Sequence, residues 1–145
     1  MCGLAGFWQQ PQNDFAEIEA LAVRMADSLA HRGPDDQGVW GDQQAGIALA
    51  HRRLAILDLS PAGHQPMVSP FGRYVIVFNG EIYNHLELRA ELAQTTAVAW
   101  RGHSDTETLL AAFETWGITR TLERSVGMFA LALWDRHERA LTVCL

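Results

Sequence analysis

The sequence predicts an α+β fold with layered packing, and two features predict it. Short apolar runs of strand length recur along the 145 residues and are separated by turn residues. Longer stretches with apolar side chains at helical spacing lie between these runs. Because helices and hairpin-like strands are mixed along one chain, we expect mainly antiparallel sheets with helices packed on their faces.

The first half of the chain is expected to begin with a buried strand and one helix. That helix has an apolar face, and Asp14 and Glu17 stand at capping-box spacing at its start. Gly33-Pro34 forces a loop, and three prolines after Ser60 predict another. The expected elements are a strand at 3–8, a helix at 14–30, a loop at 31–38, strands at 39–40 and 45–50, an extended segment at 53–59 and a loop at 60–70.

The second half begins with a strand of β-branched and aromatic residues. Asn84 opens a helix with Glu87 three positions later, and Ser104 opens another with Glu107 at the same spacing. Gly117 is expected to end the second of these helices. The expected elements are a strand at 74–78, helices at 84–93 and 104–116, a short helix to 124, and a closing hairpin of strands at 128–134 and 141–145.

The composition is that of an ordinary globular domain, with 48% hydrophobic and 19% charged residues. The net charge of −6, without a basic cluster, argues against a nucleic-acid partner. No apolar run approaches the ~20 residues of a membrane span and no signal peptide is visible, so no membrane partner is expected. The two cysteines, Cys2 and Cys144, make neither a disulfide framework nor a metal site, and we expect a reducing, cytoplasmic location.

Cys2 follows the initiator methionine, and removal of Met1 would place a thiol and a free α-amine on one residue. The amine can activate the thiol directly or through a water, which is the arrangement of an N-terminal nucleophile enzyme. The alternative is that Cys2 is only a small apolar residue of the first strand. A papain-like cysteine protease fits poorly, because it requires an internal cysteine with a histidine and an Asn or Asp partner.

Three further polar clusters lie at the ends of expected elements, where functional residues are common. Each also has a structural interpretation. Asn79-Gly80 is a typical hairpin turn, Ser104 with Asp105 caps a helix, and Arg53 is a surface charge. Structural or core roles are assigned to the remaining conspicuous residues: His31, His51, His64, His103, the Trp and Phe residues at strand and helix spacing, and Cys144 as a buried inert thiol.

Six motifs stand in order along nearly the whole chain: MCGLAGFW, HRGPDDQG, HRRLAILDLS, VFNGEIYN, GHSDTE and GMFALALWD. In this order and at these intervals they resemble the glutaminase domain of asparagine synthetases, which are class II glutamine amidotransferases. The resemblance implies the N-terminal nucleophile hydrolase fold, an α-β-β-α sandwich. It also implies glutamine as the substrate, and HRGPD favours the asparagine synthetase branch.

The resemblance implies roles for six residues of this sequence. A cysteine thiol attacks the side-chain amide of glutamine, while a side-chain amide and a backbone N–H hold the oxyanion. An arginine pairs with the substrate α-carboxylate, and two carboxylates hold its α-ammonium group. This set of charges also matches an amino-acid zwitterion. The resemblance assigns the attack to Cys2 and the oxyanion to the Asn79 amide and the Gly80 N–H. It assigns the substrate α-carboxylate to Arg53 and the α-ammonium group to Glu81 and Asp105.

The chain stops at residue 145, where relatives continue with further strands and an ATP-dependent synthetase domain. We therefore expect residues 1–145 to be a glutaminase domain that is incomplete at its C-terminus. It would need no cofactor of its own, since ATP and Mg²⁺ would serve only the absent synthetase domain. Uncovered sheet edges predict self-association. Two hypotheses follow: a glutaminase whose ammonia is used to amidate aspartate or a related acceptor, or an inactive remnant or binding module without turnover.

Overall fold

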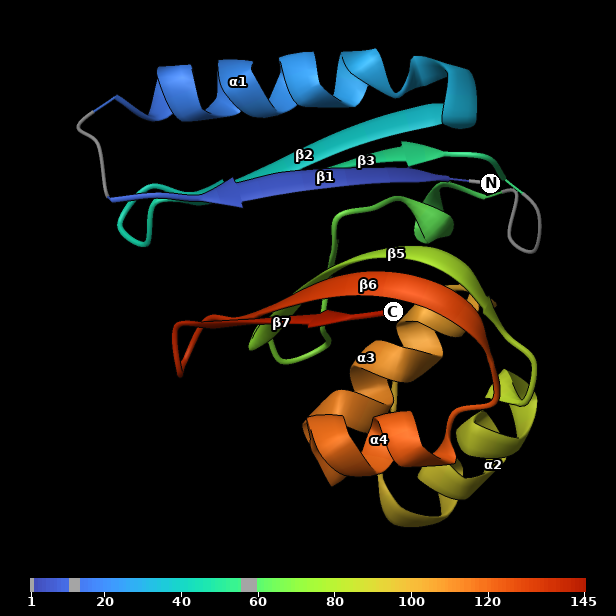
Figure 1. Ribbon diagram of the computed structural model, residues 1–145. Helices are drawn as coiled ribbons and strands as arrows, with labels where there is room; N and C mark the ends of the chain where they lie inside the picture. The colour runs from blue at the N-terminus through green and yellow to red at the C-terminus, as the bar shows by residue number, and fades with distance from the viewer. Residues whose placement is uncertain (1, 11–13, 56–59) are drawn as a thin grey trace.

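The computed structural model has four layers (Figure 1), and it describes residues 2–10, 14–55 and 60–145. Helix α1 (Phe15–Ser28) forms the first layer, and it covers a three-stranded sheet. This sheet has the order β1-β3-β2, and its strands are β1 (Gly3–Trp8), β2 (Asp36–Asp42) and β3 (Ile47–Arg53). A 3₁₀ turn at Ala30–Arg32 connects α1 to β2.

The second sheet packs against the first on the side away from α1 (Figure 1). Its order is β4-β5-β6-β7, and its strands are β4 (Met67–Val68), β5 (Tyr74–Ile82), β6 (Gly127–Asp135) and β7 (Ala140–Cys144). The outer layer consists of α2 (His85–Thr95), α3 (Asp105–Trp116) and α4 (Ile118–Arg124). Every strand pair is antiparallel, which confirms the expected α+β class.

The central strand β5 contributes to both hydrophobic layers. Successive side chains of a strand point to opposite faces of the sheet. Val75 and Val77 therefore pack between the two sheets with Trp134, whereas Ile76 and Phe78 pack toward the helices of the outer layer. By the same alternation, Asn79 extends on the face that meets the first sheet.

The structure corrects several expectations about the elements. Asn79-Gly80 is not a hairpin turn, because β5 continues through it and pairs with β6 as far as Ile82, opposite Gly127. Strand β2 begins at Asp36, within the expected loop, and β4 interrupts the expected loop at 60–70. The extended segment expected at 53–59 lies partly outside the described residues.

Some side chains assigned to the core are exposed instead. Trp8, at the end of β1, is 53% exposed. Cys144 is only half-buried, so the expected burial of its thiol is incomplete. Across the described residues, no helix combines the length and the apolar composition needed to cross a membrane.

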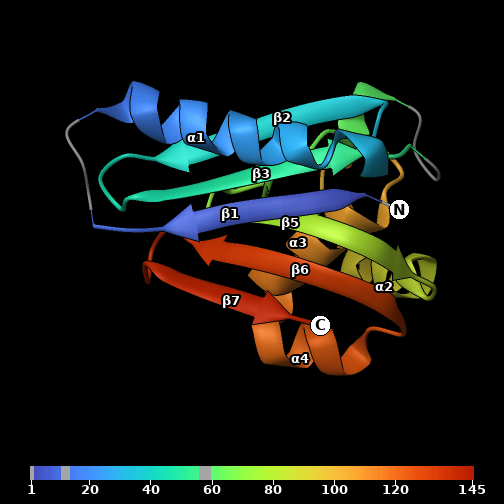
Figure 2. The same cartoon turned by 45° about the horizontal axis from the view of Figure 1, so that its top comes forward.

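The arrangement of the strands brings distant parts of the chain to one end of the sandwich. β1 begins there, and β3 and β5 end there (Figure 2). β6 begins at the same end, because its first residue, Gly127, pairs with the last residue of β5, Ile82. The ends of these four strands, and the loops that continue from them, therefore lie close together at this end of the sandwich.

Candidate active site

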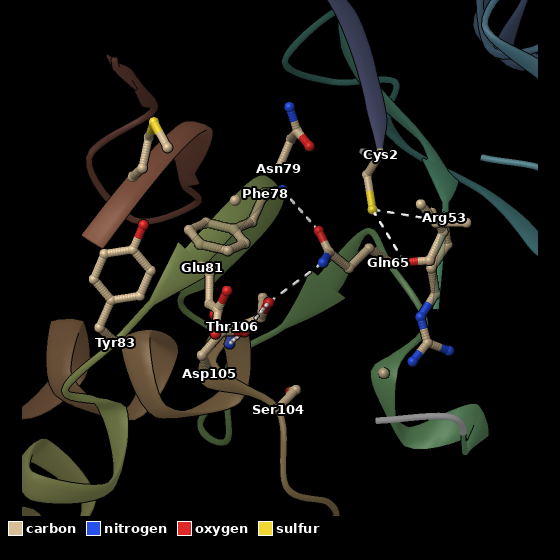
Figure 3. Close-up of a pocket in the computed structure, with 14 residues that line it drawn as sticks. Cys2, Arg53, Gln65, Phe78, Asn79, Glu81, Tyr83, Ser104, Asp105 and Thr106 are labelled. Carbon is tan, nitrogen blue, oxygen red and sulfur yellow. Dashed lines mark hydrogen bonds between the residues drawn. The ribbon is translucent and has the colours of Figure 1, made fainter. Parts of the chain in front are cut away.

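A cavity of about 250 Å³ opens at this end of the sandwich. The start of β1, the end of β3, the end of β5 and the N-terminus of α3 contribute to its wall (Figure 3). All six residues singled out from the sequence line this one cavity: Cys2, Arg53, Asn79, Gly80, Glu81 and Asp105.

The thiol of Cys2 lies against the backbone of Leu54. Its sulfur accepts a hydrogen bond from the Leu54 N–H at 3.3 Å and lies 3.6 Å from the Leu54 carbonyl oxygen. Arg32 Nε donates to the Cys2 carbonyl at 3.1 Å, and Asp35 Oδ2 accepts the N–H of Ala55 at 2.8 Å. The HRGPDDQG motif thus holds both backbone segments that surround the sulfur.

Asn79 and Gly80 lie near the end of β5, inside its pairing with β6. Within the described residues, the Asn79 amide makes no hydrogen bond to the protein, and Figure 3 shows it directed away from Gln65 and Asp105. Gly80 has φ +152°, and a Cβ at this position would lie 2.3 Å from Met128 O and 2.5 Å from Phe129 Cα. Glycine is required here because β6 passes directly against the Gly80 backbone.

Asp105 is the first residue of α3 and is 5% exposed. Its carboxylate accepts the backbone N–H of Ile82 at 2.9 Å and that of Thr106 at 2.8 Å. Burial raises the pKa of Asp105, and these two hydrogen bonds oppose the rise. The carboxylate therefore joins the end of β5 to the start of α3. The N-cap expected at Ser104 is confirmed, because its hydroxyl accepts the N–H of Glu107.

Arg53 at the end of β3 and Glu81 near the end of β5 both line the cavity. The Arg53 guanidinium lies over Gly63, where a Cβ would be 2.1 Å from Nη2, and Nη1 donates to the Ser60 carbonyl at 3.0 Å. Figure 3 shows this guanidinium directed toward the turn at Pro61–Gly63. Glu81 is exposed at the end of β5, close enough to Asp105 for their charges to interact.

Gln65 lines the same cavity and was not selected from the sequence. Its side-chain oxygen accepts the Phe78 N–H at 2.7 Å, and its Nε2 donates to Thr106 Oγ1 at 3.3 Å (Figure 3). His51 was assigned a structural role, and the structure shows it buried with Nε2 3.0 Å from the Phe78 carbonyl oxygen. The prolines near Gln65 predict a loop. No local pattern indicates that the Gln65 side chain binds Phe78, 13 positions along the chain.

A second group of residues that was not predicted from the sequence to belong to the site supports the N-terminus of α3. The buried Glu107 carboxylate accepts the N–H groups of Arg101 and Gly102 at 2.6 and 3.0 Å. Arg89 lies 3.6 Å from the same carboxylate, donates to the carbonyls of Gly102 and Ser104, and stacks over the Trp100 ring. These contacts anchor the segment that leads into Asp105.

The cavity combines a thiol, one guanidinium and two carboxylates. A thiol beside backbone N–H groups suits nucleophilic attack on an acyl carbon, since such groups can stabilise the oxyanion that forms. Separated positive and negative groups suit a ligand that carries both a carboxylate and an ammonium group. The site is therefore compatible with acyl transfer from an amino acid.

Comparison with known proteins agrees with this chemistry. Residues 1–144 match the family model described as a glutamine amidotransferase domain. The chain is 37% identical to glutamine-hydrolysing asparagine synthetase 1 of Bacillus subtilis, covering 97% of this chain and 22% of the relative. It is 36% identical to asparagine synthetase B of Escherichia coli K12, covering 99% of this chain and 24% of that protein. The chain thus spans less than a quarter of the length of these relatives.

A solved structure shares the fold. The glutamine phosphoribosylpyrophosphate amidotransferase of B. subtilis, complexed with ADP and GMP, superimposes with a TM-score of 0.70. The superposition covers 91% of this chain and 35% of that protein at 18% identity. This likeness shows the fold, whereas the match over residues 1–144 shows that the chain belongs to the class II glutamine amidotransferase domain family, matching the N-terminal part of asparagine synthetases.

Proposed function

We propose that this chain hydrolyses glutamine to glutamate and ammonia through a thioester on Cys2. The observation that carries the proposal is that all six residues selected from the sequence line one cavity, with the Cys2 thiol among them. The ammonia would serve an ATP-dependent amidation of aspartate or a related acceptor. This second reaction is proposed because the longer relatives that the chain matches in part are glutamine-hydrolysing asparagine synthetases.

The first chemical step uses both groups of an N-terminal Cys2. After removal of Met1, the α-amine takes the thiol proton and the sulfur bonds to the side-chain carbonyl carbon of glutamine. The tetrahedral adduct then collapses, the carbon–nitrogen bond breaks, and the leaving nitrogen takes the proton from the amine to depart as ammonia. Water attacks the remaining thioester, releases glutamate and restores the thiol.

The oxyanion of the tetrahedral adduct is assigned to the Asn79 side-chain amide and the Gly80 N–H. A donor of this kind contributes roughly 3–4 kcal/mol to the transition state in enzymes where it has been removed. The Asn79 amide has no protein partner within the described residues, so its donors are available to a ligand. The pairing of Gly80 with β6 makes its backbone a rigid support for the second donor.

The ends of the substrate are assigned to the charged residues of the cavity. Arg53 would bind the α-carboxylate, and the planar guanidinium suits a bidentate contact. Asp105 and Glu81 would bind the α-ammonium group from the opposite wall. Asp105 is held rigidly by two backbone N–H groups, whereas Glu81 is exposed and adds charge at the rim.

The proposal is tested by the intact mass of the purified chain before and after treatment with a diazo-ketone analogue of glutamine. We expect loss of the Met1 mass and one covalent adduct. The adduct should persist in Cys144→Ala, which removes the other cysteine, and disappear in Cys2→Ala. Release of glutamate and ammonia from glutamine should follow the same pattern among the three proteins.

The outcomes distinguish the two hypotheses. A Cys2-dependent adduct with turnover supports the glutaminase. An adduct or bound glutamine without turnover indicates a binding module, and retention of Met1 without a Cys2-dependent adduct indicates an inactive remnant. Either of the last two results would overturn the proposed function.

A further inference from the structure

We propose that Gln65, together with His51, is a positioning residue that orients the β5 backbone leading to the Gly80 N–H. The inference rests on the proposed glutaminase function, because it assigns Gln65 an effect on the oxyanion site. Gln65 would act through the backbone of Phe78, without touching the reacting atoms.

The first step of the argument is the edge of β5 that faces away from β6. On this edge β4 pairs with β5 only at Val75 and Ile76, where Ile76 lies opposite Met67. In an antiparallel ladder the next hydrogen-bonded pair on this register would join Phe78 to Gln65. Pro66 lies between the two paired positions, and the Gln65 side chain takes the place of the missing backbone acceptor at 2.7 Å.

His51 completes the restraint on the same residue. Its Nε2 is 3.0 Å from the Phe78 carbonyl oxygen, and the residue is only 1% exposed. Burial lowers the pKa of His51 to about 4, so the imidazole is neutral at pH 7 and Nε2 donates to the carbonyl. Both backbone polar groups of Phe78 are therefore bound by buried side chains, the N–H by Gln65 and the carbonyl by His51.

The second step concerns the direction of the Gly80 N–H. Alternate residues of a strand direct their backbone groups to opposite edges. The Tyr83 N–H donates to the carbonyl of Val126, just before β6, so it points to the edge that pairs with β6. The N–H groups of Phe78 and Ile82 point to the opposite edge of β5. Gly80 lies midway between those two and directs its N–H to the same edge by this alternation. The outer two N–H groups are occupied by side chains, which leaves the middle one facing the cavity.

The third step is that Gln65 is itself fixed from the first sheet. Gly38 of β2 has no side chain, and a Cβ there would lie 2.0 Å from the Gln65 carbonyl oxygen. The Gln65 backbone thus packs directly on β2 while its side chain reaches β5. Its Nε2 also donates to Thr106 Oγ1 beside Asp105. One buried amide therefore connects the oxyanion side of the cavity with the side assigned to the substrate ammonium group.

The test compares Gln65→Met, which keeps the length of the side chain but removes the acceptor, with Gln94→Met on the exposed surface of α2. We expect Gln65→Met to shift the Gly80 amide resonance in ¹⁵N–¹H spectra and to lower kcat about ten- to a hundredfold. KM should change less than about threefold, because the lost positioning acts in the transition state. Gln94→Met should change none of these quantities. If Gln65→Met does not fold, Gln65→Asn is used in its place. Its side chain is one methylene shorter, which withdraws the acceptor from the Phe78 N–H.

The results separate the inference from the function on which it rests. A folded Gln65 variant with unchanged Gly80 resonance and unchanged kcat overturns the inference while the glutaminase stands. A loss confined to KM also overturns it, because that result assigns Gln65 to ground-state binding. If the wild-type chain neither turns over glutamine nor forms the Cys2 adduct, the proposed function fails and the inference fails with it.

Discussion

The Arg32 guanidinium donates a hydrogen bond to the carbonyl oxygen of Cys2 at 3.1 Å, although the two residues are 30 positions apart in the chain. This contact fixes the backbone of the proposed nucleophile from the loop that precedes β2. The Leu54 N–H donates a hydrogen bond to the Cys2 sulfur. The position of the thiol therefore depends on tertiary contacts from two separate motifs.

Replacement of Arg32 tests this restraint. Arg32→Met removes the donor while keeping much of the side-chain volume, and we expect kcat/KM for glutamine to fall about tenfold because the thiol is less well oriented. Arg24→Met, on the exposed side of α1, is the matched control and should leave the rate unchanged. Equal rates for the two variants in a steady-state glutaminase assay would show that the contact does not orient Cys2.

Substitution of Gly80 is expected to destabilise the fold. In Gly80→Ala the new methyl would collide with the backbone of Met128 and Phe129, and we expect a loss of about 3 kcal/mol in the free energy of unfolding. Gly117→Ala is the control, because Gly117 has φ +82° but a Cβ added there would have no neighbour within 4 Å. Its loss should be smaller, about 1 kcal/mol, because only the backbone conformation is strained there. Urea unfolding of both variants measures the difference, and similar losses would contradict the predicted clash.

The raised pKa of Asp105 predicts a pH-dependent affinity for glutamine. Only the ionised carboxylate attracts the ammonium group, so KM should increase as the pH falls toward this pKa. The free energy of unfolding responds to pH in the opposite direction. Because the folded pKa of this carboxyl is raised, its protonated form favours the fold at low pH, and its ionisation at higher pH costs stability. Asp105→Asn should raise KM at neutral pH at least about tenfold and remove its pH dependence.

The control for Asp105 is Asp14→Asn at the start of α1, which keeps an acceptor at that helix cap. KM should be measured for the three proteins from about pH 5 to about pH 7.5. An unchanged pH profile in Asp105→Asn would remove this carboxylate from substrate binding.

His51 predicts a loss of stability in acid. Burial lowers its pKa to about 4 from the ordinary value of 6.5, so the unfolded chain binds a proton in this interval that the folded chain does not. The free energy of unfolding should fall by about 3 kcal/mol as the pH decreases from 6.5 to below 4. His51→Gln, which keeps a donor for the Phe78 carbonyl, should lose this component, whereas exposed His31→Gln should retain it. Denaturant unfolding at several pH values measures the difference between the variants.

The outer strand β7 predicts self-association of the 145-residue chain. Among the described residues no strand pairs with its outer edge, and Val143 is exposed on it. Val143→Lys places a charge on this edge and should shift the chain toward the monomer in sedimentation experiments. Val126→Lys, also exposed but located before β6, is the control and should not affect association. A monomeric wild-type chain would contradict the prediction.

Local sequence patterns predicted the elements whose signals lie close together in the chain. Ser104 caps α3 and Gly117 ends it, as their positions indicated. The closing hairpin of β6 and β7 was also expected and is present. By contrast, Asn79-Gly80 has the local signature of a turn, but β5 continues through it because pairing with β6 extends over nine residues. Long-range pairing outweighed the local preference.

The sequence by itself determined the fold class, the family and the six candidate site residues, because these depend on residue types at fixed intervals. Only the tertiary structure decided that these residues share one cavity and which side chains support them. Gln65, Arg32 and Arg89 act on partners that the chain order does not place beside them. A hydrogen bond across 13 or 30 residues leaves no periodic trace in a sequence, since it depends on how the sheets pack and on where the strands end.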